Sequence, residues 1–309
     1  MITGGAGFIG ANLTKRLLKN NYDINLLVRP STNLWRLKDI LPQIKIHQVD
    51  ILKKQDLSKR IRNINPSTII HLATYTQYRN QQDYEQMIKT NINGTLNLLD
   101  ASKNINYDIF INTGSSSEYG IKNKPMKEID ILEPISFYAT TKASATLLCQ
   151  AFSREYKKPI VTLRPFSVYG PYEERDRFVP IIIEAVIKNK PANLTSGDQR
   201  RDFIYINDVI DIYIKTIVKG KSLSGQVLNM GTGKEYTNEE VLKALFAVTK
   251  KKVLINKGAF PNRIWDTSHW VADISKTKKM LDWQPKYTLK KGLKETYNWF
   301  SNKTIFKHV

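Results

Sequence analysis

The residues best suited to acid–base chemistry are a tyrosine and a lysine one helical turn apart. The run Tyr138-Ala-Thr-Thr-Lys142 places both side chains on one face of a helix. A lysine beside a phenol stabilises the phenolate and lowers the pKa of the tyrosine, so the pair can move protons near neutral pH. The hydroxyls of Ser115 and Ser116 follow the apolar segment Ile109–Asn112, at a predicted strand end, where open α/β sheets bind ligands. Ser115, Tyr138 and Lys142 are therefore the catalytic candidates.

A glycine-rich turn stands at the start of the chain, in Thr3–Gly10. Glycines at positions 4, 7 and 10 let the turn tighten, let backbone approach a pyrophosphate and let a helix pack on a strand. The start of that helix then faces the phosphates with its partial positive charge. Only two residues precede Thr3, so either the true start was missed or the first strand is abnormally short. The predicted dinucleotide contacts here are Gly4, Gly7, Phe8, Ile9 and Gly10.

Three later strand ends supply further cofactor candidates. Arg29 ends the second strand, where an acidic residue would bind the adenosine ribose hydroxyls, and an arginine followed by hydroxyls suits the 2′-phosphate of NADP. Asp50 and Ile51 close the third strand, where Asp50 could bind the adenine amine. Leu72 and Ala73 end the fourth strand with small residues, against which the cofactor would lie flat. NADP is the expected cofactor, with NAD as the alternative.

Strands and helices alternate along the first half of the chain. Short β-rich runs are separated by helical stretches, a pattern typical of a parallel sheet with right-handed crossovers. The expected strands are Ile24–Val28, Ile44–Val49, Thr68–Leu72, Ile109–Asn112 and Val161–Arg164. The expected helices are Ala11–Asn20, Asp83–Lys103, Tyr138–Tyr156, Val179–Lys188, Asn238–Thr249 and Leu289–Phe300. The fold class is therefore α/β, a Rossmann-type doubly wound parallel sheet, with a smaller C-terminal substrate-binding domain.

Composition excludes several classes of protein. A chain of 309 residues with 41% hydrophobic and 25% charged residues is neither disordered nor fibrous. One cysteine and four scattered histidines provide no disulfide framework and no metal site. No apolar run approaches the ~20 residues of a membrane span, and the start lacks the pattern of a secretory signal. We expect a cytoplasmic protein without a membrane partner.

The net charge of +20 does not by itself identify a partner. Nucleic-acid binding predicts basic clusters interleaved with aromatic residues, whereas the longest basic run here is Lys250-Lys251-Lys252. Solvated lysine-rich faces explain the charge, so no nucleic-acid partner is expected. A positive field would still attract an anionic small substrate.

Taken together, these motifs resemble the extended short-chain dehydrogenase/reductase family that acts on nucleotide sugars. The resemblance rests on the glycine turn, on Asn91-Ile-Asn-Gly94-Thr95, on the serine-rich strand end and on the Tyr138/Lys142 pair. It implies that Tyr138 is the acid/base and that Lys142 holds the nicotinamide ribose and tunes Tyr138. Ser115 would hydrogen-bond the sugar oxygen that is oxidised or reduced. Asn91 would support the helix and the proton path.

The second half carries the features that the resemblance assigns to the substrate. Arg201, in Gly197-Asp-Gln-Arg-Arg201, and Arg263 match two arginines that bind a diphosphate, and paired guanidiniums suit that group. Ser167 stands where family members usually carry asparagine, and Ser116 completes the expected substrate contacts. The cofactor domain would span residues 1–168 plus about 201–234, and the nucleotide-sugar domain residues 169–200 and 235–309, with the sugar in the cleft between them. The resemblance also implies a homodimer formed through the helices near 83–103 and 138–156.

The residues narrow the reaction but leave two alternatives. Dehydratases of the family place an acid two or three residues before the equivalent of Tyr119, where this chain has Ser117 and Ser116, so a dehydratase is not expected. Arg29 favours an NADPH-dependent reductase of a 4-keto-6-deoxy sugar nucleotide. The alternative is an NAD-dependent nucleotide-sugar 4-epimerase, similar to UDP-glucose 4-epimerase. A catalytically silent cofactor-binding protein is the remaining possibility, and the complete set of Ser115, Tyr138 and Lys142 argues against it.

Overall fold

The structure is a computed structural model and describes residues 1–76, 83–260 and 267–302. The chain divides into two compact units, which are considered separately. Unit 1 comprises Met1–Gly120, Asp130–Pro165 and Ile210–Leu228, and unit 2 comprises Ile121–Ile129, Phe166–Val209 and Asn229–Val309. The assignment of cofactor and sugar to particular units stays a prediction. None of the described helices is long and apolar enough to cross a membrane.

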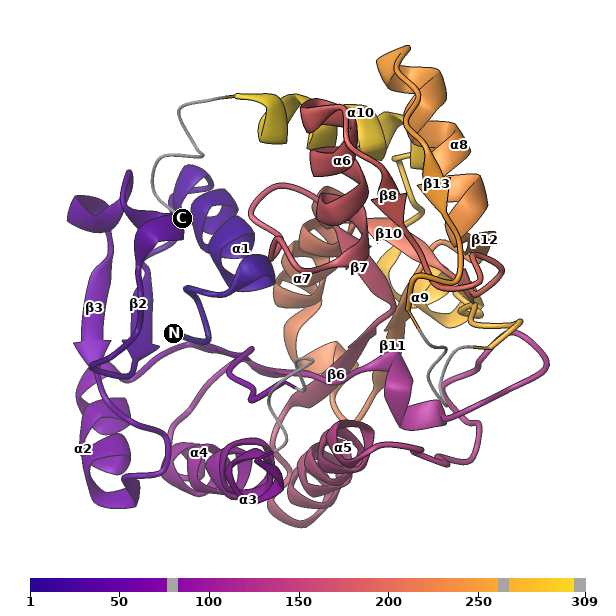
Figure 1. Ribbon diagram of the computed structural model, residues 1–309. Coiled ribbons are helices and arrows are strands. Elements are labelled where there is room, and N and C mark those ends of the chain that lie inside the picture. The colour runs from indigo at the N-terminus through magenta and orange to yellow at the C-terminus, as the bar shows by residue number, and fades with distance from the viewer. Residues whose placement is uncertain (77–82, 261–266, 303–309) are drawn as a thin grey trace. The chain divides into compact units, whose positions relative to one another are not determined.

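A seven-stranded sheet carries the first unit, with the strand order β11-β6-β5-β4-β1-β2-β3 (Figure 1). Strands β1 to β6 pair in parallel, and the order reverses direction around β1, between β2 and β4. This is the doubly wound arrangement of the Rossmann fold, so the predicted fold class is confirmed. Strand β1 is only two residues long, yet it pairs with a strand on each side. The strands are β1 (Ile2–Thr3), β2 (Asn25–Val28), β3 (Lys45–Gln48), β4 (Thr68–His71), β5 (Ile109–Thr113), β6 (Ile160–Pro165) and β11 (Val227–Met230).

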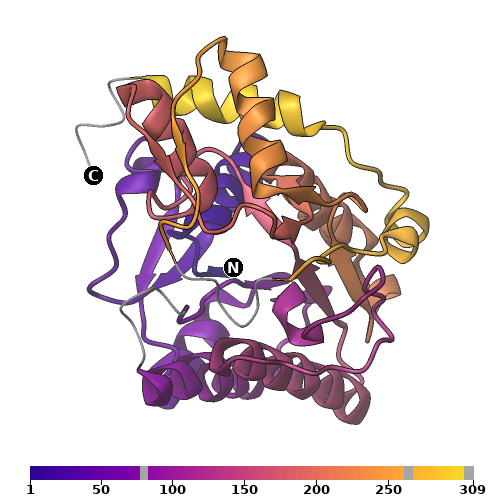
Figure 2. The ribbon, with the colours of Figure 1, turned by 45° about the vertical axis from the view of Figure 1, so that its right-hand side comes forward.

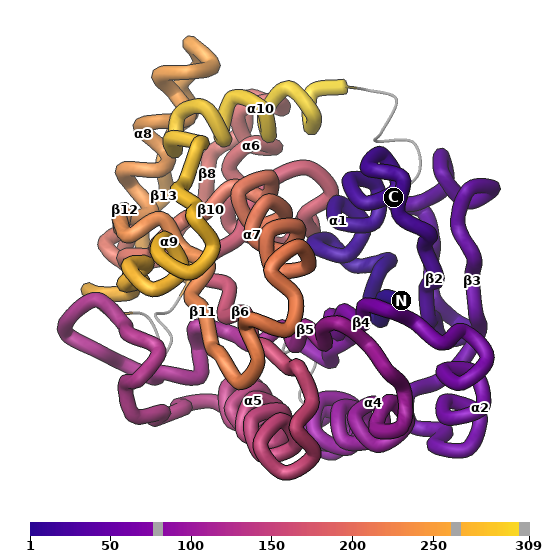
Figure 3. Tube along the Cα trace, turned by 180° about the vertical axis from the view of Figure 1, so that it is seen from behind, coloured from indigo at the N-terminus to yellow at the C-terminus, as the bar shows by residue number. Residues whose placement is uncertain are grey.

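Helices cover both faces of this sheet. One face carries α2, α3, α4 and α5, with α4 packed between α2 and α5 (Figures 1 and 2). On the other face α1 and α7 lie side by side, and the Arg16 guanidinium of α1 is 3.3 Å from the Asp211 carboxylate of α7 (Figure 3). The helices are α1 (Phe8–Lys19), α2 (Lys54–Ile64), α3 (Tyr84–Ile88), α4 (Gly94–Ser102), α5 (Phe137–Tyr156) and α7 (Ile206–Lys219). Short helical turns are η1 (Trp35–Leu37), η2 (Leu41–Gln43), η3 (Lys89–Asn93), η4 (Ser116–Tyr119) and η5 (Gly220–Leu223).

Apolar side chains from the sheet and from α2, α4 and α5 form one core beneath the sheet. Leu27 of β2, Leu98 of α4 and Phe110 of β5 belong to it, and all three are almost completely buried. The only cysteine of the chain, Cys149 on α5, lies in the same core with 1% of its surface exposed. Removing this apolar surface from water is the main stabilising contribution to the unit.

The helix predicted over Asp83–Lys103 is interrupted by one wider turn. Residues Lys89–Asn93 form the π-helical turn η3 between α3 and α4. Such turns carry one extra residue per turn and often occur at functional sites. Here the turn brings Asn91 inside the protein, with 1% of its surface exposed.

The described residues of unit 2 form short strand pairs and four helices. Strands β7 and β10 pair in parallel, as do β8 and β13, whereas β9 and β12 are antiparallel. Trp283 is 4% exposed and therefore packs inside this unit. The strands are β7 (Ser167–Tyr169), β8 (Ala192–Asn193), β9 (Arg200–Arg201), β10 (Phe203–Tyr205), β12 (Tyr236–Thr237) and β13 (Ile255–Asn256). The helices are α6 (Phe178–Lys188), α8 (Asn238–Thr249), α9 (Ser275–Leu281) and α10 (Leu289–Ser301).

Candidate active site

The start of α5 places the tyrosine and the lysine. The Ser136 hydroxyl accepts a hydrogen bond from the Ala139 N–H at 3.2 Å, so it caps the helix and fixes Tyr138 in the first turn. Tyr138 is half-buried, and Lys142, one turn further on, is 5% exposed. The helical spacing predicted from the sequence is therefore present.

Lys142 joins this helix to the end of β5. Its Nζ donates to the Thr113 carbonyl oxygen at 2.5 Å, and Ser115 follows two residues later. The Ser115 hydroxyl is 2.7 Å from the Ser117 hydroxyl and also accepts from the Ser117 N–H at 3.2 Å. Burial lowers the pKa of Lys142, and the negative charge of Glu118 opposes that shift. The structure thus gathers the hydroxyls of 115–117, Lys142 and the first turn of α5 at the C-terminal end of β5.

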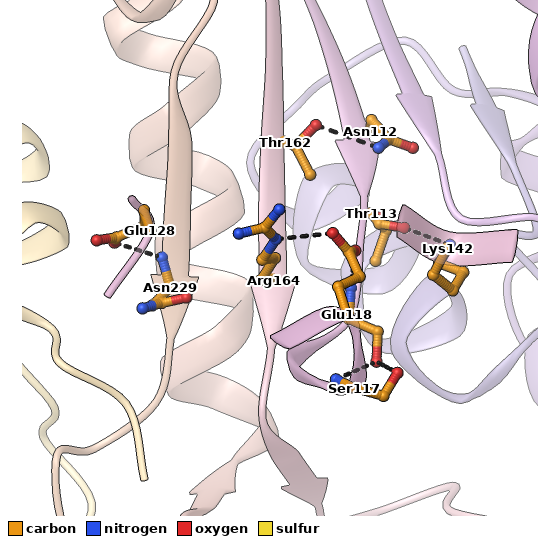
Figure 4. A network of polar contacts seen from close by, with 10 residues as sticks. Asn112, Thr113, Ser117, Glu118, Glu128, Lys142, Thr162, Arg164 and Asn229 are labelled. Carbon is orange, nitrogen blue, oxygen red and sulfur yellow. Dashed lines mark hydrogen bonds and ion pairs between the residues drawn. The ribbon is translucent and has the colours of Figure 1, made fainter. Parts of the chain in front are cut away.

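A buried ion pair lies directly behind these serines. Glu118 Oε2 accepts from Arg164 Nε at 2.8 Å (Figure 4). Glu118 Oε1 accepts the Ser115 backbone N–H at 2.7 Å. Both side chains are almost fully buried, and the guanidinium also lies 4.6 Å from the centre of the Tyr119 ring. Neither charged residue was predicted from the sequence. One feature of the sequence could have indicated them. Each is a charged residue in or next to an apolar strand segment, and a buried charge requires a partner of opposite charge.

Asn91 uses its side chain to join three segments. Its Oδ1 accepts from the Tyr75 N–H at 2.7 Å and from the Thr74 hydroxyl at 3.0 Å. Its Nδ2 donates to the Tyr75 carbonyl and to the Thr141 hydroxyl, each at 2.9 Å. Thr141 in turn donates to the Tyr138 carbonyl at 2.9 Å. Asn91 therefore fixes the chain after β4 against the turn of α5 that carries Tyr138.

A buried histidine connects the glycine turn to the same asparagine. His71 Nδ1 is 2.7 Å from the Thr3 hydroxyl, and His71 Nε2 is 3.0 Å from the Thr95 hydroxyl. Thr95 donates its proton to the Asn91 carbonyl, so it accepts from His71, and the neutral ring therefore carries its proton on Nε2. Burial, aided by the positive charge of Lys142, lowers the pKa of His71 to about 3.

The glycine turn has the shape required for a pyrophosphate. A Cβ at Gly10 would lie 2.2 Å from the Gly4 carbonyl oxygen, and one at Gly4 would lie 2.5 Å from the Ala73 nitrogen. Gly4 also has a φ of 71°, which favours glycine. Gly7 precedes α1 and has no side chain that could cap the first N–H groups of this helix. Phe8 and Ile9 form the first turn of α1 and are half-buried. These residues fit a dinucleotide whose phosphates face the helix start.

The remaining cofactor candidates differ in exposure. Arg29 is exposed at the end of β2. Asp50 is half-buried, and its Oδ1 accepts from the Leu52 N–H at 2.9 Å. Ile51 lies in the core, where its side chain occupies the space left by Gly94. Leu72 and Ala73 are half-buried just after β4.

Arg36, which was not predicted, comes close to the glycine turn. Its guanidinium lies 3.5 Å from the Ala6 carbonyl oxygen and 4.6 Å from the centre of the Trp35 ring.

Two of the predicted substrate contacts lie in unit 2. Ser167 begins β7, and its N–H donates to the Asp202 carbonyl at 3.0 Å. Arg201 lies in β9 with its guanidinium 5.1 Å from the centre of the Trp270 ring. Arg263 lies outside the described residues. Ser116 belongs to unit 1 and is 6% exposed. Among the described residues, no group of acidic, histidine or cysteine side chains could hold a metal ion.

Comparison with known proteins decides the family. A family model described as the NAD dependent epimerase/dehydratase family matches residues 1–231. The chain belongs to this family. It is therefore an enzyme of that kind, as the sequence motifs predict.

Individual members of the epimerase/dehydratase family match nearly the whole chain. A UDP-glucuronate 4-epimerase of Thermodesulfobacterium geofontis is 32% identical over 320 residues, which cover 97% of this chain and 95% of the relative. A dTDP-glucose 4,6-dehydratase of Neisseria meningitidis is 27% identical, covering 100% of this chain and 95% of the relative. The crystal structure of UDP-glucuronic acid 4-epimerase from Bacillus cereus, in complex with UDP-glucuronic acid and NAD, matches with a TM-score of 0.88 at 30% identity over 98% of both chains.

Proposed function

We propose that this enzyme is an NAD-dependent 4-epimerase of a nucleoside-diphosphate sugar, with UDP-glucuronate and UDP-glucose as the first substrates to test. The observation that carries the proposal is the end of β5, where the paired hydroxyls of Ser115 and Ser117 follow Thr113, whose carbonyl accepts from Lys142 of α5. The similarity to two UDP-glucuronate 4-epimerases supports the same choice. These comparisons favour the alternative of the sequence analysis over the reductase.

The residues divide the chemistry between them. When NAD is bound, it supplies an acceptor for the hydride of C4 and then returns that hydride. Tyr138, as phenolate, takes the proton of the C4 hydroxyl and gives it back when the carbonyl is reduced. Lys142 stabilises the phenolate by its charge, and Ser115 hydrogen-bonds the same sugar oxygen. Ser116 and Ser117 stand where a dehydratase needs an acid, so these residues provide no acid for eliminating water.

The diphosphate would be held by residues of unit 2. Arg201 and Arg263 are the proposed guanidinium contacts, and Ser167 is the proposed third contact. Arginine suits this task because its planar group donates two parallel hydrogen bonds to a phosphate.

A second candidate function is the NADPH-dependent reduction of a 4-keto sugar nucleotide. Its support is Arg29, which is exposed at the end of β2 and has the charge that a 2′-phosphate requires. Arg36, close to the glycine turn, adds a second positive charge to the same region.

The two functions differ in how the cofactor is held. An epimerase regenerates its cofactor in each cycle and retains it, whereas a reductase must exchange it. We expect the purified protein to contain NAD and to interconvert UDP-glucuronate or UDP-glucose with its C4 epimer without added cofactor. Preference for NADPH, reversed in Arg29→Asp, together with turnover of 4-keto sugar nucleotides, would replace the epimerase with the reductase. Cofactor binding without turnover of any sugar nucleotide would indicate a silent homologue.

The enzyme is further proposed to be a homodimer. Large apolar side chains lie exposed on α3, α4 and α5, which cover one face of unit 1 (Figure 2). The Tyr84 and Phe137 rings stack at 4.1 Å, and both are partly open to solvent. Pairing these helices with those of a second copy would bury the exposed Ile88, Leu96 and Leu147.

A further inference from the structure

Glu118 is the buried carboxyl group of the catalytic region. Burial raises its pKa, and the charges of Arg164 and Lys142 oppose that shift. Both of its oxygens accept hydrogen bonds, as an ionised carboxylate does, and Arg164 from β6 is paired directly with it. Lys142 from α5 donates to the carbonyl of Thr113, two residues before Ser115. Two other titratable groups near Lys142 are neutral, because burial lowers the pKa of His71 to about 3 and raises the pKa of the Cys149 thiol to about 12. Two buried cations therefore share the charge of one carboxylate.

The local backbone is shaped around this carboxylate. A Cβ at Gly114 would lie only 2.5 Å from Glu118 Oε1 and 3.2 Å from the Arg164 side chain. Gly114 therefore leaves the space that the carboxylate fills. From that place one oxygen of Glu118 binds Arg164 (Figure 4), and the other accepts the Ser115 N–H. The catalytic serine is thus fixed through its own main chain.

We propose that Glu118 is a positioning residue for the reaction: it orients Ser115 through the backbone N–H and supplies the negative charge that keeps the Lys142 ammonium protonated beside Tyr138. This proposal rests on the proposed function, because it assigns Lys142 its role in acid–base catalysis. Without the carboxylate, Lys142 would share a water-poor region with an uncompensated guanidinium. It would then lose its proton at a lower pH, and the phenolate of Tyr138 would lose its neighbouring positive charge.

The test is the pH profile of kcat for Glu118→Gln. Glutamine retains an oxygen for the Ser115 N–H but removes the charge, so the alkaline limb of the profile should move about one pH unit lower. Glu118→Asp retains the charge and shortens the side chain, so kcat should fall while the alkaline limb stays in place. Glu128→Gln is the matched control, because Glu128 also accepts a backbone N–H, from Asn229 at 2.9 Å, and lies in unit 2. Its profile should equal that of the unchanged enzyme.

A second measurement does not depend on the reaction. In a double-mutant cycle on the free energy of unfolding, Glu118→Gln and Lys142→Met should be non-additive, because each removes the other's partner charge. If Glu118→Gln does not fold, Glu118→Gln/Arg164→Gln takes its place, since it leaves no unpaired charge in that pair. An unmoved alkaline limb or additive free energies would overturn the proposal. Non-additive free energies in a protein that turns over no nucleotide sugar would instead reject only the proposed function.

Discussion

The phenol of Tyr138 is the one group that the proposed chemistry cannot lose. Tyr138→Phe removes the proton carrier but keeps the ring on α5, so turnover should fall at least ~100-fold, while the affinity for NAD stays nearly unchanged. Tyr156→Phe is the matched control, because it makes the same change at the last residue of the same helix. Retained activity in Tyr138→Phe would remove the catalytic assignment. Steady-state kinetics and cofactor titration check both variants.

His71 should make the stability of the protein depend on pH. Its folded pKa of about 3 lies below the 6.5 of an exposed histidine, so between these values the unfolded chain binds more protons. The contribution of His71 is fully present above pH 6.5 and falls by about 1.4 kcal/mol per pH unit below it.

Urea unfolding of His71→Gln should therefore show a flatter loss of stability between pH 6.5 and 5 than the unchanged protein. The exposed His269, replaced in the same way, serves as the control. Equal slopes in all three proteins would contradict the assigned neutral state of His71.

Among individual residues, the sequence identified those whose functional partner lies only a few positions away in the chain. Tyr138 and Lys142 are visible because four residues make one helical turn. Glu118 and Arg164 are 46 residues apart, and their ion pair exists because β5 and β6 are neighbours in the sheet. The sequences of β5 and β6 do not reveal that these strands are neighbours in the sheet. The pair could therefore only have been predicted from the general rule that buried charges are paired.

At the scale of elements, the glycine turn allows a comparison within one loop. Gly10→Ala would place a methyl group 2.2 Å from the Gly4 carbonyl oxygen, whereas a methyl group at Gly7 would lie 3.4 Å from the same oxygen. Gly7 also has an ordinary φ of −74°. We expect Gly10→Ala to lower the unfolding temperature and Gly7→Ala to leave it nearly unchanged. Both should weaken NAD binding, because each crowds the pyrophosphate.

Thermal unfolding and NAD titration check the pair. Equal unfolding temperatures would mean that the turn relaxes around the added methyl group.

Two of the elements that the sequence did not predict have few apolar positions. Helix α2 buries only Leu57 and Ile61 among many charged residues, so its period is weak. Strand β11 is four residues long and contains the polar Asn229. The wide turn at Asn91 is invisible for another reason, since one extra residue in a helical turn leaves no mark on composition.

For the whole molecule, the proposed dimer gives a direct prediction. Leu147 on α5 is 55% exposed, and Leu147→Glu would place a charge in the proposed helix interface. The variant should elute as a monomer in size-exclusion chromatography with light scattering, whereas the unchanged enzyme should elute as a dimer. Val218→Glu is the control, because Val218 is 74% exposed and belongs to α7, which lies on the opposite face of the sheet (Figure 1). A monomeric unchanged enzyme would reject the dimer.

The fold as a whole was predictable because alternating strands and helices admit few arrangements. The preferred reaction was not, since it depended on Arg29 alone, and an exposed arginine is compatible with either cofactor.

The buried thiol of Cys149 is a built-in probe for the opening of α5. Its sulfur lies in the core on α5, less than two turns beyond Lys142, and no other cysteine competes for reagent. A thiol-specific label can react only when this helix opens, so the labelling rate reports the opening of the element that carries Tyr138. Slower labelling in the presence of NAD would show that ligand binding and the opening of α5 are coupled, without any engineered probe.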